Sequence, residues 1–194
     1  TAMPERTGGQ LIVDALEANG CRRIFCIPGE SYLAVLDALH DSPIQTIVCR
    51  NEGGAAMMAD VHGKLTGEPG VCFVTRGPGA TNASHGVHIA AQDSTPMILF
   101  IGQIARGIRE REAFQEVDYK QFFGGMAKWV AEIDDAARIP EFVTRAYSVA
   151  TSGRPGPVVL ALPEDMLRDV VPSSKPLAYV PVPQAPGMEA VAKM

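Results

Sequence analysis

Apolar residues follow two alternating patterns along the chain, and together these predict a regular succession of strands and helices. Short, continuous apolar runs of strand length are bounded by Gly, Pro or charged residues, and between them apolar residues recur every three to four positions, as on one face of a helix. The predicted strands are 22–27, 44–49, 71–75, 96–101, 127–133 and 157–162. The predicted helices are 5–19, 31–40, 52–67, 80–92 and 135–152.

The predicted strands are apolar throughout and do not alternate with polar positions, which is typical of a sheet covered on both faces. Because strands and helices alternate along the chain, the sheet is expected to be parallel. The predicted fold is therefore α/β: a doubly wound, mainly parallel six-stranded sheet with helices on both faces. We expect this fold to occupy residues 1–170 as one domain.

Two segments depart from this alternation. Residues 102–125 form a charged stretch without clear periodicity, and long irregular segments inside compact domains tend to be functional or mobile. Residues 171–194 are rich in proline, which predicts an extended linker toward a downstream domain. A free tail is the alternative for this last segment.

Composition narrows the function classes. The chain has 194 residues, and its charged fraction of 20% is below the roughly 25% of an average soluble domain, which hints at burial against a partner. A net charge of -5 argues against a nucleic-acid partner. No apolar run approaches the roughly 18 residues of a membrane span, and the first residues lack a signal-peptide pattern. We therefore expect a cytoplasmic protein without nucleic-acid or membrane partners.

The four cysteines and the histidines do not predict a metal site. Cys21, Cys26, Cys49 and Cys72 form no C-x-x-C pair and have no nearby His at zinc-ligand spacing. We expect Cys26, Cys49 and Cys72, which lie in predicted strands, to be reduced and buried and to be neighbours in the sheet. His85 and His88 stand three residues apart on a predicted helix, where a surface or core pair is expected.

The candidate for chemistry is Glu52, which lies where an apolar strand runs directly into a helix. In open α/β sheets, ligands bind at the carboxyl ends of the strands. Four small residues, Gly53, Gly54, Ala55 and Ala56, follow it and would let a flat ligand or another backbone approach closely. The structural alternative is that a Glu in the first helical turn is simply favoured by the helix dipole.

Other short motifs carry less information. The segment 76–82 has the strand-to-helix context of a dinucleotide fingerprint, but Asn82 occupies the place of its third glycine. The segment 62–66 does not match a P-loop, because Met58 replaces its first glycine. Ser31 and Ser84 lack the G-x-S-x-G setting of a hydrolase nucleophile.

Six motifs in register, with the expected strands between them, resemble a known family. They are FCIPG at 25–29, RNEGGA at 50–55, GPGATN at 77–82, GQ at 102–103, AFQE at 113–116 and RPGP at 154–157. Over about residues 10–170 the chain resembles the N-terminal pyrimidine-binding domain of thiamine-diphosphate enzymes, and most closely their acetolactate synthase branch.

This resemblance implies roles for particular residues. The carboxyl group of Glu52 would meet the ring nitrogen of the cofactor's aminopyrimidine and activate the cofactor, which requires a pocket shielded from water. Gln115 would be the second catalytic residue. The resemblance implies that the cofactor is also bound by Pro28, Gly29, Pro78 and Asn82, and that the substrate side is formed by Glu30, Ser31, Phe114 and Gln115.

The chain also departs from the acetolactate synthase pattern. Glu30 and Ser31 stand where Gly and Ala are common, Asn51 stands before the glutamate where His is usual, and Arg76 stands where Ser is usual. The charges of Glu30 and Arg76 leave the identity of the substrate open. The adjacent histidines that decarboxylases of the superfamily often carry after the fourth strand are absent, which favours carboligation.

The expected function is therefore acetolactate synthase-like carboligation of 2-oxo acids by a homodimer or homotetramer. The resemblance places Mg²⁺ and the cofactor's diphosphate in a downstream domain, so the 194-residue chain alone is expected to be inactive. It leaves a requirement for FAD open. The alternatives are a decarboxylase or lyase of the same superfamily, and a non-catalytic binding module that retains the fold.

Overall fold

A computed structural model describes residues 4–173 and 176–182. Its main feature is a six-stranded sheet in which every neighbouring pair of strands is parallel, in the order β3-β2-β4-β5-β7-β6. The strands are β2 (Arg23–Cys26), β3 (Gln45–Val48), β4 (Gly70–Val74), β5 (Met97–Gln103), β6 (Trp129–Glu132) and β7 (Pro157–Pro163). The predicted parallel α/β fold is confirmed.

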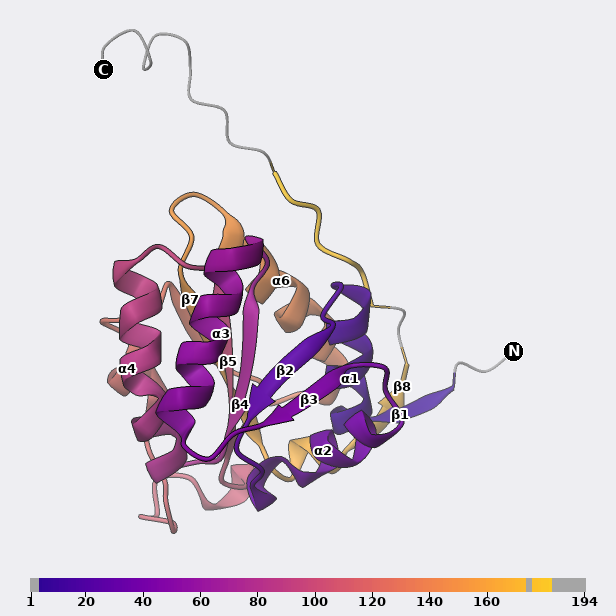
Figure 1. The fold of residues 1–194 in the computed structure, drawn as a ribbon. Coiled ribbons are helices and arrows are strands. Elements are labelled where there is room, and N and C mark those ends of the chain that lie inside the picture. The colour runs from indigo at the N-terminus through magenta and orange to yellow at the C-terminus, as the bar shows by residue number, and fades with distance from the viewer. Residues whose placement is uncertain (1–3, 174–175, 183–194) are drawn as a thin grey trace, which may run out of the picture.

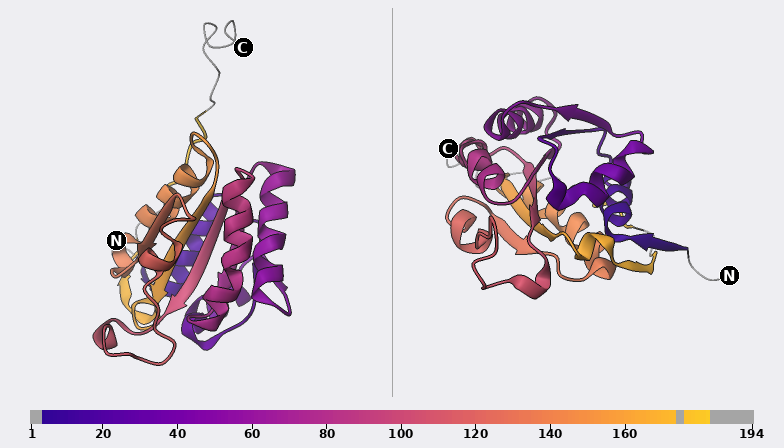
Figure 2. Two further views of the ribbon diagram at one scale, coloured as in Figure 1. Left: turned by 90° about the vertical axis from the view of Figure 1, so that its left-hand side faces the viewer. Right: turned by 90° about the horizontal axis from the view of Figure 1, so that it is seen from below.

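Helices cover both faces of this sheet (Figures 1 and 2). One face packs against α1 (Gly8–Ala18), α2 (Leu33–His40) and α6 (Ile139–Thr151), and the other against α3 (Glu52–Thr66), α4 (Pro78–Gln92) and α5 (Tyr119–Phe123). Four short 3-10 helices complete the helical elements of the described chain: η1 (Glu30–Tyr32), η2 (Arg106–Ile108), η3 (Ala136–Arg138) and η4 (Met166–Arg168).

The central strands form the core. Every residue of β4, β5 and β7 is buried, as expected for parallel strands covered on both faces. The rings of Phe73 and Phe100 stack with centroids 4.6 Å apart, and Tyr32 packs against Phe73 at 5.7 Å. The same expectation is wrong for β3, an edge strand with three of its four residues exposed.

The two ends of the described chain differ from the predicted pattern. Residues 5–7 begin no helix: they form β1 (Glu5–Thr7), which pairs antiparallel with β8 (Val170–Pro172). Helix α1 starts at Gly8 because Thr7 and Gln10 form a capping box. Further along, Tyr179 packs against Tyr147 with ring centroids 5.4 Å apart. Residues after 170, including Tyr179, therefore still contact the domain. Residues 174–175 and 183–194 of the expected linker lie outside the described residues.

Two further expectations concern segments between elements. The irregular stretch 102–125 contains the end of β5 and the short helices η2 and α5, joined by turns. None of the helices in the described part of the chain combines the length and the apolar character that crossing a membrane requires.

Candidate functional site

The candidate site lies where the sheet's connections change direction. From β2 the chain moves outward to β3, whereas from β4 it moves the other way to β5, so the segments after β2 and β4 diverge at the carboxyl edge. This is the switch point at which open α/β sheets bind ligands. The right-hand view of Figure 2 looks toward this edge.

Glu52 is the first residue of α3 and lies half-buried at this edge. Asn51 caps the helix, because its side-chain oxygen accepts a hydrogen bond from the Gly54 N–H at 3.2 Å. The capping role accounts physically for the Asn before the glutamate. The Nδ2 of Asn82, one turn into α4, donates to Glu52 Oε2 at 3.1 Å. Two residues predicted to share a site therefore contact each other.

Small residues set the distance between α3 and α4. A Cβ added at Gly86 would lie 2.5 Å from Ala56 Cβ and 2.9 Å from the Ala56 carbonyl carbon. A Cβ added at Gly53 would lie 2.0 Å from His85 Nε2. The close approach of these helices holds the carboxylate of Glu52 against Asn82. Gly53 and Ala56, which the sequence predicts to face a ligand or a backbone, face the neighbouring helix.

The segment after β2 is held against β4 by small and hydroxyl side chains. Ser31 Oγ and Thr75 Oγ1 are 2.7 Å apart and share a hydrogen bond. A Cβ added at Gly29 would lie 2.6 Å from Thr75 Cβ, and one added at Gly102 would lie 2.1 Å from Ser31 Oγ. These contacts bury Ser31, whereas Pro28 remains exposed at the edge.

Arg76 extends from the end of β4 and is 8% exposed. Its Nη1 donates to Glu164, which follows β7, at 3.0 Å, and its Nη2 donates to Glu30 at 3.5 Å. The charges of Glu30 and Arg76, which the sequence places near the expected pocket, are therefore paired with each other. Glu164 adds a second carboxylate to this pair. This arginine connects the segments after three strands.

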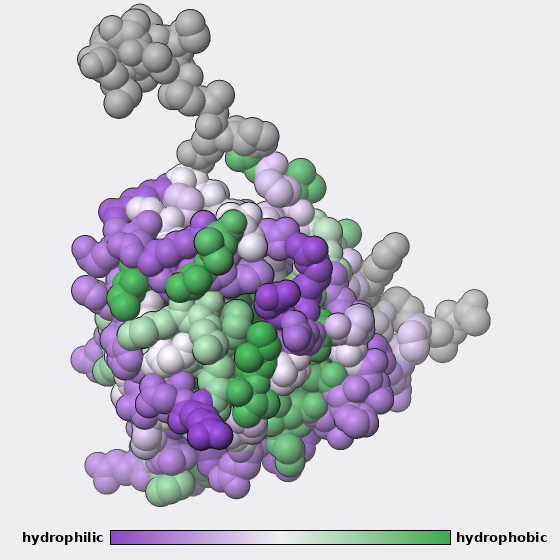
Figure 3. All heavy atoms as spheres, viewed as in Figure 1, coloured by the Kyte–Doolittle hydropathy of each residue, from purple (hydrophilic) through white to green (hydrophobic). Residues whose placement is uncertain are grey.

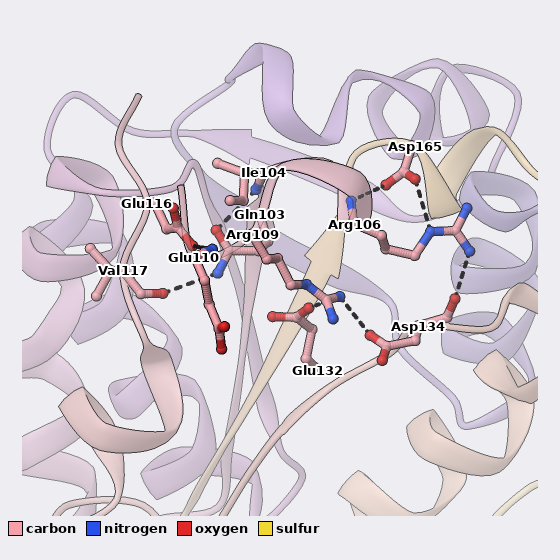
Figure 4. A network of polar contacts seen from close by, with 10 residues as sticks. All are labelled: Gln103, Ile104, Arg106, Arg109, Glu110, Glu116, Val117, Glu132, Asp134 and Asp165. Atoms are coloured by element: carbon pink, nitrogen blue, oxygen red, sulfur yellow. Dashed lines mark hydrogen bonds and ion pairs between the residues drawn. The ribbon is translucent and has the colours of Figure 1, made fainter. Parts of the chain in front are cut away.

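The segment 104–118 is anchored by a polar network (Figure 4). Gln103 at the end of β5 donates from Nε2 to the Val117 carbonyl at 3.1 Å and accepts from the Ile104 N–H at 2.9 Å. Arg106 donates to Asp165 at 2.8 Å. Arg109 donates to Asp134 at 2.7 Å and also pairs with Glu132.

Two glutamates of this network have shifted pKa values. The carboxylate of Glu116 accepts hydrogen bonds from the backbone N–H groups of Glu110 and Ala113, at 2.6 and 3.0 Å, and these lower its pKa. Burial raises the pKa of Glu132, although the charge of Arg109 opposes this effect. The segment is therefore held in place by side chains, without helix or strand hydrogen bonds over most of its length.

This anchored segment carries Phe114 and Gln115. The Phe114 side chain is 76% exposed, while Gln115 is half-buried with φ of 65°. A Cβ added at Gly77 would lie 2.7 Å from Gln115 Cβ, and Gly77 itself has φ of 61°. Gly77 is therefore required both by its backbone conformation and by the nearby Gln115.

Tyr119 connects the same loop to α5. Its hydroxyl oxygen accepts a hydrogen bond from the buried Gly77 N–H at 2.9 Å, and burial raises its pKa to about 12. The structure thus brings Gln115 next to the start of α4, where Pro78 lies exposed at the first helical position.

The four cysteines differ in burial. Cys26 and Cys72 are buried on adjacent strands, and burial raises the pKa of Cys26 to about 11, which keeps its thiol protonated. Cys21 and Cys49 are half-buried, so the prediction of burial is wrong for Cys49. Across residues 4–173 and 176–182, no group of three or more His, Cys, Asp or Glu side chains is placed to hold a metal ion.

Three residues of the edge were not among the sequence candidates: Thr75, Tyr119 and Glu164. Thr75 and Glu164 are polar residues directly after the buried strands β4 and β7, a signal related to the strand-to-helix junction that identified Glu52. That signal could have identified both. Tyr119 gave no such signal, because its contact with Gly77 joins residues 42 positions apart.

Comparisons with known proteins place the chain among related sequences. The family model "Thiamine pyrophosphate enzyme, N-terminal TPP binding domain" matches residues 6–122. The acetolactate synthase of Bacillus subtilis (strain 168) is 37% identical over 169 residues, which cover 87% of this chain and 30% of that protein. The probable acetolactate synthase large subunit of Methanocaldococcus jannaschii is 42% identical over 159 residues, covering 82% of this chain and 27% of that protein. The chain spans less than a third of the length of these relatives.

Proposed function

The chain belongs to the thiamine pyrophosphate enzyme family and matches its N-terminal TPP binding domain, and on this premise we propose that it binds the pyrimidine end of thiamine diphosphate in an enzyme acting on 2-oxo acids. The observation that carries the proposal is the contact of Glu52 with Asn82 at the switch point of the sheet. This contact presents a half-buried carboxyl group at the edge where a ligand is expected.

The residues at the edge fit a flat, hydrogen-bonding ring. Apart from its chain neighbours and the adjacent backbone of its own helix, nothing in the described structure lies within 4 Å of a Cβ added at Gly54, so space is open beside the start of α3. A Cβ added at Gly79 would lie 3.7 Å from Glu52 Oε1 and 2.9 Å from Thr75 Cγ2, and would narrow the space beside the carboxylate. The exposed rings of Pro28 and Pro78 offer apolar contacts at the same edge.

In this proposal, Glu52 would hold the cofactor's pyrimidine nitrogen through a shared proton, and Asn82 would fix the orientation of the carboxyl group. When bound, the cofactor supplies the carbon nucleophile and electron sink for 2-oxo acid chemistry. Gln115 contributes an amide near the reacting atoms, and Phe114 contributes an exposed ring that excludes water on the substrate side. Gly29 and Ser31 set the position of the segment after β2 through their contacts with Thr75.

We favour acetolactate synthase-like carboligation, with a decarboxylase or lyase of the same superfamily as the second candidate. The relatives named acetolactate synthase support the first. The buried Arg76, paired with Glu30, places two charges on the substrate side of the proposed site. Product analysis of the complete protein with a panel of 2-oxo acids separates coupled products from simple aldehydes.

The proposal assigns the diphosphate and Mg²⁺ to a part of the complete protein outside this chain. Residues 1–170 would form the pyrimidine-binding domain, and residues 171–194 would lead to the next domain. Because metal-held diphosphate supplies much of the affinity, the 194-residue chain should bind the cofactor poorly and be inactive. Micromolar affinity by calorimetry on this chain would contradict that assignment.

The outer face of α3 supports assembly with a second copy. Apolar side chains gather over this helix (Figure 3), and the exposed ones on α3 and the adjoining end of β3 are Val48, Met57, Met58, Val61 and Leu65. We propose that a second subunit covers this surface and closes the site at Glu52, as a homodimer or homotetramer. Val61→Lys should convert the complete protein to monomers in sedimentation analysis; an unchanged oligomer would exclude this face.

The proposed role of Glu52 is tested with Glu52→Gln in the complete protein. The matched control is Glu68→Gln, which removes an exposed carboxylate beyond the opposite end of α3. Glu52→Gln should abolish cofactor-dependent turnover while the circular dichroism spectrum stays unchanged, and the control should retain turnover. Undiminished turnover in Glu52→Gln would end the assignment.

A further inference from the structure

A groove opens beside the proposed site, between α2 and η4. It has a volume of about 830 Å³ and reaches the carboxyl edge at Glu30, Ser31 and Arg76. Its walls are apolar in part, because Leu33, Leu36 and Leu167 line it. The groove therefore combines a charged end with walls suited to a short hydrocarbon chain.

Arg76 forms the charged end, and its guanidinium group is incompletely paired. Glu164 accepts from Nη1 at 3.0 Å, a normal charge-assisted hydrogen bond. The Nη2 of Arg76 reaches Glu30 at 3.5 Å, the outer limit of a hydrogen bond. The Nε atom is buried and has no hydrogen-bond partner within the described chain. A cation buried to this degree is stabilised by a second firm partner.

Glu30 is poorly fixed as that partner. Its side chain is 80% exposed, whereas that of Glu164 is 32% exposed. Moving Glu30 into water costs little, because the Glu30 carboxylate is already largely hydrated. A ligand carboxylate entering the groove could then take its place on Arg76, and the planar guanidinium fork suits such a group.

We propose that Arg76 is a specificity-determining residue that binds a second carboxylate of the substrate, with Glu30 as its displaceable counter-ion. The proposal rests on the proposed function and names its substrate class: a dicarboxylic 2-oxo acid, or an acceptor carrying a carboxylate. The leucine-lined walls would contact the methylene groups between the two acidic ends.

The test uses calorimetry on the complete protein with succinate as the probe and butyrate as its monocarboxylate match. Succinate should bind the parent protein more tightly than butyrate. Arg76→Met should weaken succinate binding by about tenfold, as expected for a lost charge-assisted hydrogen bond. Arg76→Lys should recover part of it. Glu30→Gln should tighten succinate binding, because the competing carboxylate is gone.

Asp37→Asn is the matched control. It removes a carboxylate that lines the same groove without pairing with Arg76 in the described structure. A general electrostatic effect would make Asp37→Asn and Glu30→Gln equivalent, and that result would overturn the proposal. Equal affinities for succinate and butyrate in the parent protein would also overturn it. If Arg76→Met does not fold, Glu30→Gln decides the outcome, because its side chain lies on the surface.

Thiamine diphosphate titration of the same samples separates this proposal from the proposed function. If the parent protein does not bind the cofactor, the proposed function is contradicted, whereas the measured succinate affinities still test the role of Arg76. Normal cofactor binding, with succinate affinity that is insensitive to both Arg76 and Glu30, would contradict the specificity proposal alone.

Discussion

Replacing Gly86 by Ala should separate α3 from α4 and destabilise the chain. The added methyl group would lie 2.5 Å from Ala56 Cβ, 2.9 Å from the Ala56 carbonyl carbon and 3.1 Å from the Met57 nitrogen. Two of these are backbone atoms of α3, so no side-chain rotation relieves the overlap. The helix as a whole has to move.

The magnitude follows from two opposing terms. Overpacking a buried contact costs about 1–3 kcal/mol, and obstruction by backbone places this case at the upper end. Ala is favoured over Gly inside a helix by about 1 kcal/mol. The net loss in the free energy of unfolding is therefore about 2 kcal/mol. Gly54→Ala supplies the control, since the new methyl group would meet no described atom within 4 Å apart from its chain neighbours and the adjacent backbone of its own helix. It should gain about 0.5–1 kcal/mol.

Urea unfolding of the 194-residue chain, followed by circular dichroism, measures both variants at once. The free energy of unfolding of Gly54→Ala should exceed that of Gly86→Ala by about 3 kcal/mol. In the complete protein, Gly86→Ala should also weaken cofactor binding, because it shifts Glu52 away from Asn82. A Gly86→Ala chain as stable as Gly54→Ala would refute the close packing that positions the carboxylate.

Three further predictions concern the loop that carries Gln115. Tyr119→Phe leaves the buried Gly77 N–H without its acceptor and should lower the unfolding free energy by about 1–3 kcal/mol in the same urea assay. Glu116 has a folded pKa below its ordinary value of 4.5, so its stabilisation is present above pH 4.5 and is lost as pH falls through the folded pKa; the stability deficit of Glu116→Gln should disappear over that range, and a deficit constant with pH would contradict this. Glu132 has the opposite shift, with a folded pKa above 4.5. Between pH 4.5 and the folded pKa the folded state therefore binds more protons than the unfolded state, and stability falls as pH rises through this range. Glu132→Gln should therefore gain stability relative to the parent as pH rises from 4.5, and a parallel pH profile would refute the assignment.

The order of elements was predictable because local pattern and tertiary burial agree. Strands β4, β5 and β7 are short apolar runs in the sequence, and the structure buries them completely. The short sheet of β1 and β8 was not predictable, since each strand has three residues and they pair across more than 160 positions. Their pairing depends on the rest of the fold being in place.

In the candidate site too, single residues could be predicted from the sequence, but the contacts between them could not. Glu52 was identifiable because it begins the helix that follows an apolar strand, and Asn82 because it lies in a recognisable motif. The hydrogen bond between them required the helix packing that only coordinates reveal. Arg76 and Glu164 are 88 positions apart, so sequence could mark each as a charge at a strand end but not as a pair. Likewise, the positive φ of Gln115 results from the anchored loop and leaves no local signal.

The most direct test of the account is the rate at which the cofactor's thiazolium C–H exchanges with deuterium on the complete protein, measured by NMR after rapid quenching. The parent protein should accelerate this exchange, and Glu52→Gln should slow it by at least about 100-fold with cofactor still bound, as expected for loss of a positioned acid–base group. Exchange as fast in Glu52→Gln as in the parent, at equal cofactor occupancy, would contradict the role assigned to Glu52.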